Sequence, residues 1–281
     1  MMLLYGRPVA RRVLDELGVK VKLLELEGIH PCLAIISTSN KKHDVIISKQ
    51  KQKIAEKAGI KTKLYHLEAP SNESLLDLIS SLNTSNEVHG IFLHLPLQSY
   101  LNKTKIISAI SPKKDVDCIT PNSLANLLIG KQEYYSASVK AIFRLIEYYK
   151  ISLQHKHWVI LGSAEYLSKP LANALLFRNI SFSFLSEVTP SVIPILRYAD
   201  VIVTMGLENG VIEGSMVKEE VTVIDFGNHH IDDSVFGDVD HTSVKRKAKY
   251  VTPVPGGVGP LLITMLLENT VDAALKSLKP N

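Results

Sequence analysis

The residues best suited to close contact with a ligand lie between Tyr250 and Pro260. Three prolines in this stretch fix the backbone φ angle, and three glycines allow conformations and close approaches that other residues resist. An apolar helix is expected directly behind it, over residues 261–270. A linker would be polar and would not lead into such a helix. We therefore expect a shaped loop whose bare backbone approaches a ligand, with a rigid turn that binds nothing as the alternative.

Glycines also end three short apolar runs in the second half of the chain. Gly162, Gly206 and Gly227 each follow such a run directly. Open sheets of parallel strands bind ligands at the carboxyl ends of their strands, where the backbone turns into a loop. The pattern therefore predicts ligand contacts at these three turns.

The elements that must position these turns follow from two periods of hydrophobicity. Short apolar runs predict buried strands, and apolar residues at helical spacing predict amphipathic helices. We expect strands within residues 32–36, 61–67, 89–97, 157–162, 181–185, 201–206 and 222–227, and helices over 7–27, 73–82, 138–149, 170–177, 192–198, 261–270 and a lysine-rich segment ending near Gly59. Strands that alternate with helices predict an α/β fold with a parallel sheet, because crossover connections are right-handed.

Composition limits the class of protein. A chain of 281 residues with 46% hydrophobic residues can form two domains with real cores. The net charge of +4 is mild and the lysines are scattered, so we expect no nucleic-acid partner. Cys32 and Cys118 match no metal or redox spacing, and each is expected to pack as a small apolar residue. No apolar run reaches the ~18–20 residues that span a membrane, so a cytoplasmic protein without a membrane partner is expected.

Several longer motifs resemble those of one enzyme family. In chain order they are Gly6-Arg7-Pro8-Val9-Ala10, Pro31-Cys32-Leu33-Ala34-Ile35, Gly90-Ile91-Phe92-Leu93-His94-Leu95-Pro96-Leu97, Pro112-Lys113-Lys114-Asp115-Val116-Asp117, Val223-Ile224-Asp225-Phe226-Gly227, Gly237-Asp238-Val239 and Pro253-Val254-Pro255-Gly256-Gly257-Val258-Gly259-Pro260. Over nearly its whole length the chain resembles a divergent member of the methylenetetrahydrofolate dehydrogenase/methenyltetrahydrofolate cyclohydrolase family.

The resemblance implies two domains and a homodimer. Residues 1–138 with 264–281 would form an α/β folate-binding catalytic domain that contains a parallel sheet, and residues 139–263 a Rossmann-like domain for NAD(P). The final helix would return to the first domain, and the active site would be the cleft between the domains. The implied activities, within one-carbon metabolism and purine biosynthesis, are oxidation of methylenetetrahydrofolate and hydrolysis of the methenyl product to formyltetrahydrofolate.

The resemblance also assigns residues to the folate site. Lys49 falls at the lysine of the family's Y-x-x-x-K pair and would activate the attacking water, although a lysine on a solvated helix is the alternative. An amine in a partly desolvated cleft can be pushed towards neutrality and take a proton. Val45 stands where that pair has its tyrosine, and His94 where the family has glutamine. Asp117 would hold the polar edge of the pterin ring through two parallel N–H bonds. Further substrate contacts are expected at Pro96, Gly256, Gly257 and Pro260.

The cofactor half departs further from the family pattern. The turn expected to hold phosphate contains Gly162, Ser163 and Ala164, with Ser163 in place of an arginine. The residues expected at the other strand ends are Ser186, Glu187, Thr189, Gly206 and Gly227. A glutamate at position 187 would accept a hydrogen bond from a ribose 2′-hydroxyl and repel a 2′-phosphate. The resemblance implies NADP, whereas Ser163 and Glu187 favour NAD, and the possibility that no cofactor binds stays open.

The departures from the family pattern leave two other functions open. Most of them fall on polar, ligand-facing positions while the scaffold glycines persist, which fits a folate-binding paralogue without useful catalysis. An NAD-dependent enzyme with a changed substrate fits Glu187 alone. No metal is expected in any of these cases. We adopt the bifunctional enzyme as the leading hypothesis.

Overall fold

The computed structural model describes residues 1–38, 42–163, 167–232 and 234–278, and the side chains of residues 42–47 lie outside this description. Contacts divide the chain into two compact units. One consists of Met1–Ala10 with Ser138–Leu262, and we call it the six-stranded unit. The other consists of Arg11–Ala137 with Ile263–Asn281, and we call it the three-stranded unit.

A small parallel sheet forms the centre of the three-stranded unit. Its strands β2 (Cys32–Ser37), β3 (Lys61–His66) and β4 (Gly90–Leu93) lie in the order β3-β2-β4. All residues of β2 and β4 are buried, which agrees with their unbroken apolar sequences. The sheet therefore forms a rigid base whose strand ends carry the polar residues of the site.

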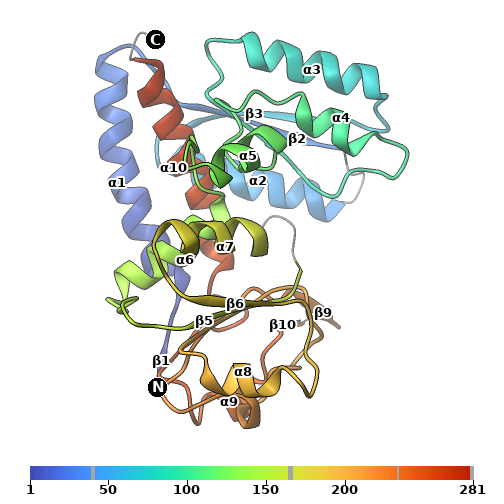
Figure 1. The fold of residues 1–281 in the computed structure, drawn as a ribbon. Coiled ribbons are helices and arrows are strands. Elements are labelled where there is room, and N and C mark those ends of the chain that lie inside the picture. The colour runs from blue at the N-terminus through green and yellow to red at the C-terminus, as the bar shows by residue number, and fades with distance from the viewer. Residues whose placement is uncertain (39–41, 164–166, 233, 279–281) are drawn as a thin grey trace. The chain divides into compact units, whose positions relative to one another are not determined.

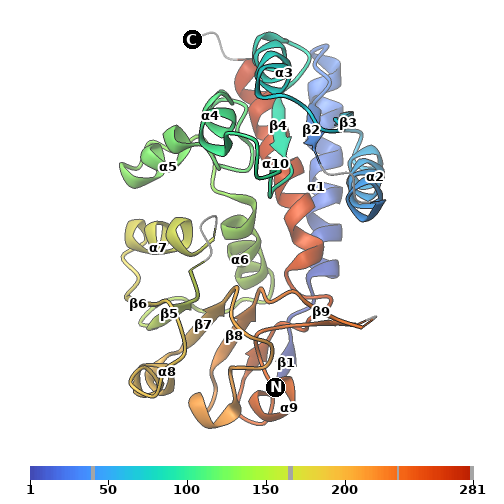
Figure 2. The same ribbon diagram turned by 90° about the vertical axis from the view of Figure 1, so that its right-hand side faces the viewer.

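Helices surround this sheet, and the last of them comes from the end of the chain. They are α1 (Gly6–Leu26), α2 (Lys42–Lys57), α3 (Asn72–Thr84), α4 (Lys103–Ser108), α5 (Pro121–Leu128) and α10 (Gly259–Ser277). Helices α1 and α10 lie side by side (Figures 1 and 2), and Lys20 on α1 pairs with Asp272 on α10 at 3.7 Å. The return of the final helix to the folate half, which the resemblance implied, is thus part of this unit.

The other unit is built on a doubly wound parallel sheet. Its order is β1-β11-β8-β7-β5-β6, formed by β1 (Met2–Leu3), β5 (Trp158–Leu161), β6 (Phe182–Leu185), β7 (Val201–Thr204), β8 (Thr222–Asp225) and β11 (Tyr250–Val251). Helices α6 (Ala137–Tyr148) and α7 (Ser168–Phe177) cover one face of this sheet, and α8 (Ile193–Tyr198) and α9 (His241–Val244) cover the other (Figures 1 and 2). The expected α/β class with parallel sheets is confirmed.

A β-hairpin lies between β8 and β11 of the six-stranded unit. Strands β9 (His229–Ile231) and β10 (Ser234–Phe236) pair antiparallel, and a short 3₁₀ helix (Gly214–Met216) precedes β8. Neither the hairpin nor the short helices α4, α5 and α9 were expected, because each is too short to show a hydrophobic period. Most of the longer strands and helices were predicted close to their observed bounds, but α10 extends seven residues beyond the predicted end at residue 270.

One predicted domain boundary differs from the structure. We expected residues 1–10 to belong to the folate half, but they group with the six-stranded unit. The reason is that Met2 and Leu3 pair in parallel with Tyr250 and Val251 and extend that sheet. Among the described residues, no helix is both long enough and apolar enough to cross a membrane.

Candidate functional site

The six-stranded sheet reverses its direction of growth beside β5. The chain passes from β5 through α7 to β6 on one side, and then places β7 on the other side of β5. Ligands of open α/β sheets bind outside the carboxyl ends of the strands at such a reversal. Gly162 follows β5 and Gly206 lies just beyond β7, so two of the predicted glycines stand at this point.

Gly162 is required here by both conformation and space. Its φ is +103°, and a Cβ at this position would overlap the carbonyl oxygen of Met205. The Ser168 hydroxyl donates a hydrogen bond of 2.8 Å to the Gly162 carbonyl, and this fixes the turn against the start of α7. No described side chain caps that helix end, so its N–H groups and positive dipole end can receive a phosphate.

The other predicted cofactor residues near this turn are accessible. Ser163, Ser186 and Glu187 are exposed, and Glu187 follows β6, the strand that pairs with β5. Thr189 is half-buried and shares a 2.8 Å hydrogen bond with the Ser191 hydroxyl. Ala164 lies outside the described residues. The turn after β5 and the acidic residue after β6 thus end neighbouring strands, as a dinucleotide site requires.

The loop of prolines and glycines is shaped by contacts within its own unit. Gly256 has a φ of +109° and its carbonyl accepts a 3.0 Å hydrogen bond from the Gly6 N–H. The Gly257 N–H donates to the Pro253 carbonyl at 2.7 Å. A Cβ on Gly6 would overlap the Gly257 carbonyl oxygen. These contacts explain the glycines at 256 and 257 without a ligand, and Pro260 lies in the first turn of α10.

In the three-stranded unit, Lys51 approaches the polar residues, not the expected Lys49. The Lys51 ammonium lies 4.0 Å from the centre of the Phe92 ring, while the Lys49 side chain is exposed. Phe92 in turn packs edge-on against His94, with 6.2 Å between ring centres. Residues 49 and 51 are about 200° apart around a helix, so only one of them can face the sheet. Val45 lies on α2, and its side chain is not described.

Asp117 is the most strongly perturbed acid near Lys51. Burial and the neighbouring charge of Asp115 raise the pKa of Asp117 from 3.8 to about 7, against a smaller lowering by the positive charge of Lys51. The Asp115 carboxylate is fully buried and accepts hydrogen bonds from the N–H groups of Ile119 and Thr120, at 3.1 and 2.8 Å. A carboxyl that titrates near neutral pH beside an amine can accept hydrogen bonds from a ligand or transfer a proton.

Helix α10 supports the segment that carries Asp117. The side-chain amide of Asn269 donates to the carbonyls of Val116 and Tyr135, at 2.7 and 2.9 Å. Cys118 next to Asp117 has a φ of +55°, is buried, and its thiol donates to the Tyr134 carbonyl. The cysteine is thus packed as expected. Asn269 was missed, because no local pattern links a residue in an apolar helix to a loop 153 residues earlier.

His94 and Pro96 lie in the turn after β4. His94 is half-buried, Pro96 is exposed, and the Leu95–Pro96 peptide bond is cis. The amide of Gln98, two residues further on, donates to the Thr38 carbonyl after β2. Lys51, His94 and Asp117 therefore gather at one end of this sheet, although we expected Lys49 in place of Lys51. Among the described residues, no group of three or more acidic, His or Cys side chains could hold a metal.

A parallel sheet that reverses beside a glycine turn, with an acidic residue after the next strand, is the architecture of dinucleotide-binding proteins. The six-stranded unit belongs to this class. Comparison with known families defines the chain further. The model of the tetrahydrofolate dehydrogenase/cyclohydrolase catalytic domain matches residues 4–117, and that of the NAD(P)-binding domain matches residues 136–278. The chain therefore belongs to the tetrahydrofolate dehydrogenase/cyclohydrolase family.

Individual relatives agree with this assignment over the full length. The chain is 37% identical to "Bifunctional protein FolD" of Lactobacillus delbrueckii subsp. bulgaricus, over 96% of this chain and 95% of the relative. It is 38% identical to the protein of the same name from Thermodesulfovibrio yellowstonii, over 97% of this chain and 96% of the relative. The crystal structure of the bifunctional FolD dehydrogenase/cyclohydrolase from Campylobacter jejuni is 35% identical, with a TM-score of 0.95 and 99% of each chain covered. The Trypanosoma brucei enzyme, complexed with NADP and an inhibitor, is 28% identical, with a TM-score of 0.94 and 100% and 99% covered.

Proposed function

We propose that the protein oxidises methylenetetrahydrofolate to methenyltetrahydrofolate with NAD(P) and then hydrolyses that product to formyltetrahydrofolate. Family membership supports both activities. The observation that carries the proposal is the position of Lys51 beside Asp117 at the end of the three-stranded sheet, because these groups supply an amine and a carboxyl where the ring of a folate needs them. NAD(P) supplies the hydride acceptor, and the protein supplies orientation and proton transfer.

Hydrolysis needs a base but no cofactor. Water adds to the cationic methenyl carbon and a base accepts one water proton. The remaining hydroxyl proton is then passed to one ring nitrogen as the bond from that nitrogen to the carbon breaks, which leaves the formyl group. We assign the base to the Lys51 amine and not to Lys49, because Lys51 is half-buried, its side-chain nitrogen lies over the Phe92 ring, and its charge acts on Asp117. His94, whose ring packs against Phe92, would help to orient the substrate.

Asp117 would anchor the substrate through the polar edge of the pterin ring. A carboxylate that accepts two parallel N–H bonds gives both affinity and orientation. Pro96, Gly256, Gly257 and Pro260 remain proposed substrate contacts. Neither Val45 nor Ile47, which lies four residues before Lys51, carries the hydroxyl of the family's tyrosine that would orient the lysine.

For the cofactor, the residues support NAD over NADP. The turn at Gly162, with its positive φ, and the start of α7, which no described side chain caps, suit a pyrophosphate. Glu187 is exposed at the end of β6, where an acidic residue accepts from a ribose 2′-hydroxyl and repels a 2′-phosphate. Ser163 supplies no positive charge for that phosphate.

A direct assay tests the proposal. The purified protein is given methylenetetrahydrofolate with NAD or NADP, and the methenyl absorbance is followed; hydrolysis of methenyltetrahydrofolate is assayed separately. Turnover in both assays is the expected result. Measurable folate binding without turnover in either assay would contradict the proposal.

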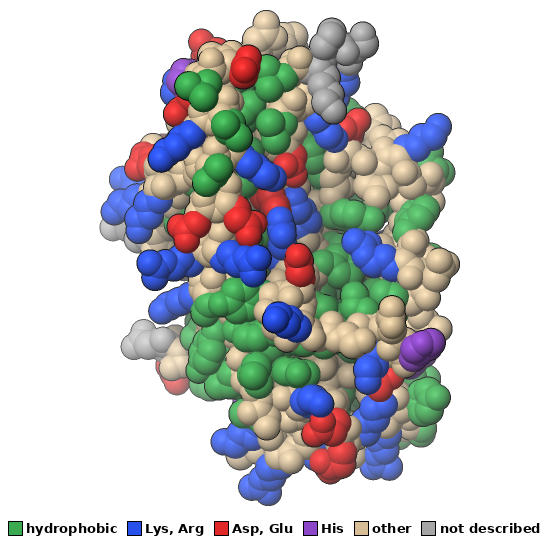
Figure 3. All heavy atoms as spheres, turned by 90° about the vertical axis from the view of Figure 1, so that its left-hand side faces the viewer, with side chains coloured by type: hydrophobic (Ala, Val, Ile, Leu, Met, Phe, Trp, Pro, Cys, Tyr) green, Lys and Arg blue, Asp and Glu red, His purple; other side chains and the backbone are tan. Residues whose placement is uncertain are grey.

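We further propose a cytoplasmic homodimer that serves purine biosynthesis and binds no nucleic acid. Two apolar side chains on the β9–β10 hairpin, Ile231 and Phe236, are 44% and 43% exposed, and a second subunit would bury them. On the face drawn in Figure 3, Lys and Arg side chains are interspersed with Asp and Glu side chains. That distribution fits a protein without a continuous basic surface for nucleic acid. Sedimentation analysis tests the dimer.

A further inference from the structure

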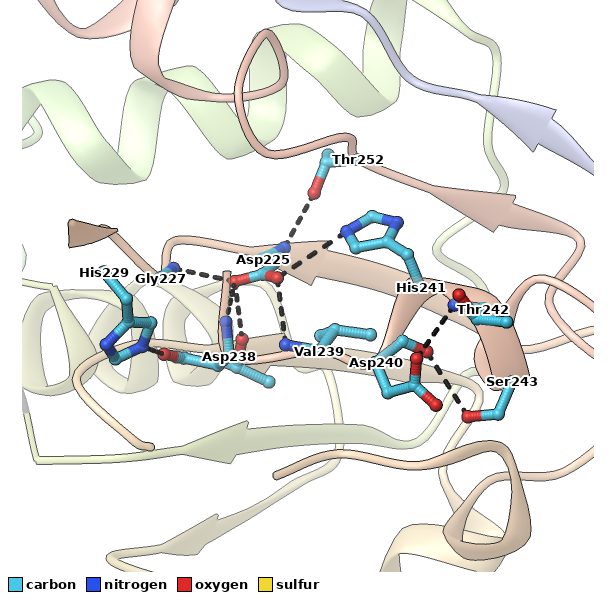
Figure 4. A network of polar contacts seen from close by, with 11 residues as sticks. Asp225, Gly227, His229, Asp238, Val239, Asp240, His241, Thr242, Ser243 and Thr252 are labelled. Atoms are coloured by element: carbon cyan, nitrogen blue, oxygen red, sulfur yellow. Dashed lines mark hydrogen bonds and ion pairs between the residues drawn. The ribbon is translucent and has the colours of Figure 1, made fainter. Parts of the chain in front are cut away.

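A buried carboxylate stands at the end of β8. The Asp225 side chain is 1% exposed, and its Oδ1 accepts hydrogen bonds from the N–H groups of Gly227 and Asp238, at 2.7 and 3.1 Å (Figure 4). Its Oδ2 accepts from the Val239 N–H at 3.2 Å. One side chain thus fixes the backbone of two segments, the turn after β8 and the stretch that follows the β9–β10 hairpin.

A second carboxylate and two imidazoles complete the network (Figure 4). Asp238 is fully buried, and its Oδ1 lies 2.8 Å from Nε2 of His229 on β9. Nε2 of His241 lies 3.8 Å from Oδ2 of Asp225. The side chains of His229 and His241 are 25% and 31% exposed. Among the described residues, Asp238 Oδ2 has no hydrogen-bond partner.

Two glycines leave room for this arrangement. A Cβ on Gly237 would overlap a carboxylate oxygen of Asp225, and a Cβ on Gly227 would overlap the Asp238 nitrogen. The motifs Asp225-Phe226-Gly227 and Gly237-Asp238-Val239 are therefore two halves of one interlocked structure. Each motif supplies one buried carboxylate and one glycine, and that glycine leaves room for the aspartate of the other motif.

This arrangement costs free energy. Burial, and to a smaller extent the charge of Asp238, raise the pKa of Asp225, while the N–H groups of Gly227 and Asp238 act in the opposite direction. A fold that needed only a tight turn could use apolar residues here, because replacing buried charges by apolar groups is often neutral or stabilising. Such a network is expected where the position of the backbone matters for function.

The turn that the network holds ends in an exposed residue. Asn228 follows Gly227 at the carboxyl end of β8, two strands from Gly162 in the same sheet. No hydrogen bond of Asn228 to another described residue is observed. Its amide and backbone can therefore meet a ligand at the edge where cofactors of open sheets bind.

We propose that Asp225, Asp238 and His229 are positioning residues of the cofactor site: they hold the turn of residues 226–228 so that Asn228 and its backbone contact NAD(P). The proposal rests on the proposed dehydrogenase function. His229 acts through Asp238 and not on the ligand, since its Nε2 is directed to that carboxylate. A donor nitrogen at the end of the 229 side chain is therefore what the site requires.

The test compares His229→Leu, which removes the donor, with His229→Gln, which keeps one, and with His230→Leu on the same strand. Dissociation constants for NADH and NADPH are measured by fluorescence, and amide hydrogen exchange is measured at Gly227 and Val239. We expect His229→Leu to weaken binding of the preferred cofactor at least tenfold and to speed exchange at both amides. His229→Gln should retain most of the cofactor affinity and most of the protection from amide exchange, and His230→Leu should match the wild type in both measurements.

The outcomes separate two kinds of failure. If the wild-type protein binds neither NADH nor NADPH, the proposed dehydrogenase function fails, and the positioning role fails with it. If the wild type binds and His229→Leu stays within twofold of it, only the positioning role is overturned. Methenyl hydrolysis, which needs no cofactor, is the further control: a parallel loss of hydrolysis and of melting temperature in His229→Leu would mean general unfolding and would also overturn the proposal.

Discussion

The Cα of Gly162 faces the carbonyl oxygen of Met205 so closely that no side chain fits between these two strand ends. Gly162→Ala would force the strands apart and also place alanine at a φ of +103°. We expect a loss of about 2 kcal/mol or more in the free energy of unfolding and a loss of NAD(P)H binding. Urea unfolding and fluorescence titration measure the two effects.

Gly206→Ala is the matched control for that substitution. Gly206 also has a positive φ, +71°, but a Cβ there would meet nothing within 4 Å. Gly206→Ala should lower the free energy of unfolding by only about 1 kcal/mol, the cost of an alanine in the left-handed backbone region. Equal effects of the two substitutions would show that the contact with Met205 is unimportant.

Lys51→Ala should lower the rate of methenyl hydrolysis by about 10²–10⁴-fold, the usual effect of removing a general base. Lys49→Ala, on the same helix and exposed, should stay within twofold of the wild type. Stopped-flow absorbance at saturating substrate gives both rates. A larger loss of hydrolysis rate in Lys49→Ala than in Lys51→Ala would show that Lys49 is the base.

Asp117 gives the protein a defined dependence on pH. Because its folded-state pKa of about 7 lies above the ordinary value of 3.8, folding favours the protonated form. The resulting stabilisation is complete below about pH 4 and is lost as the pH rises through 7. In Asp117→Asn, the difference in unfolding free energy between pH 5 and pH 8 should therefore shrink. An unchanged difference would mean that Asp117 does not titrate in this range.

The same titration should govern folate binding. A carboxylate accepts two N–H bonds from the pterin edge, whereas the protonated acid does not. Affinity for a non-reactive folate analogue should rise as the pH passes through 7 in the wild type and stay flat in Asp117→Asn. Calorimetry at pH 6 and pH 8 measures this, and equal slopes would remove Asp117 from the substrate site.

Glu187→Ala should weaken NAD binding by about tenfold, the cost of one hydrogen bond to a charged acceptor. The double substitution Ser163→Arg with Glu187→Ser should improve NADP binding, because it removes a repulsive charge and adds an attractive one. Glu208→Ala, an exposed acid in the same unit, is the control. NADP preference in the wild type would contradict the assignment of Glu187.

Asn269→Leu removes both hydrogen bonds that α10 makes to the segment carrying Asp117. The carbonyls of Val116 and Tyr135 would lose these partners, so we expect a loss of about 2–3 kcal/mol in unfolding free energy. Asn122→Leu, exposed on α5, should have little effect. Thermal unfolding with and without a folate analogue would show whether the substrate site loses affinity as well.

The sequence predicted most of the scaffold because long runs show their period. The apolar runs of β2, β4 and β5 identify buried parallel strands, and the spacing from Val9 to Leu24 identifies α1. The two residues of β1 show no such signal, and only their pairing with β11 makes them a strand. That is why the grouping of residues 1–10 with the six-stranded unit was not expected from the sequence.

The candidate site was harder to predict than the scaffold. Several lysines lie close together in α2, and the sequence does not show which of them faces the sheet. The residues before them include no tyrosine that would fix the alignment with the family's Y-x-x-x-K pair. The contact with Phe92, the lower exposure and the electrostatic action on Asp117 distinguish Lys51 from Lys49, and these depend on the folded structure. Asn269 and the link from His229 to Asp238 depend on contacts between distant segments, which a single sequence does not display.

The pairing of residues 2 and 3 with residues 250 and 251 has a consequence for synthesis on the ribosome. This edge of the sheet cannot form until almost the whole chain has emerged, and contacts of such long sequence separation form slowly. The three-stranded unit is likewise completed only by α10, whose Asn269 bonds to Val116. Both units combine early and late segments of the chain, so a nascent chain exposes unpaired edges and apolar surface, the kind of surface that chaperones bind, until late in its synthesis.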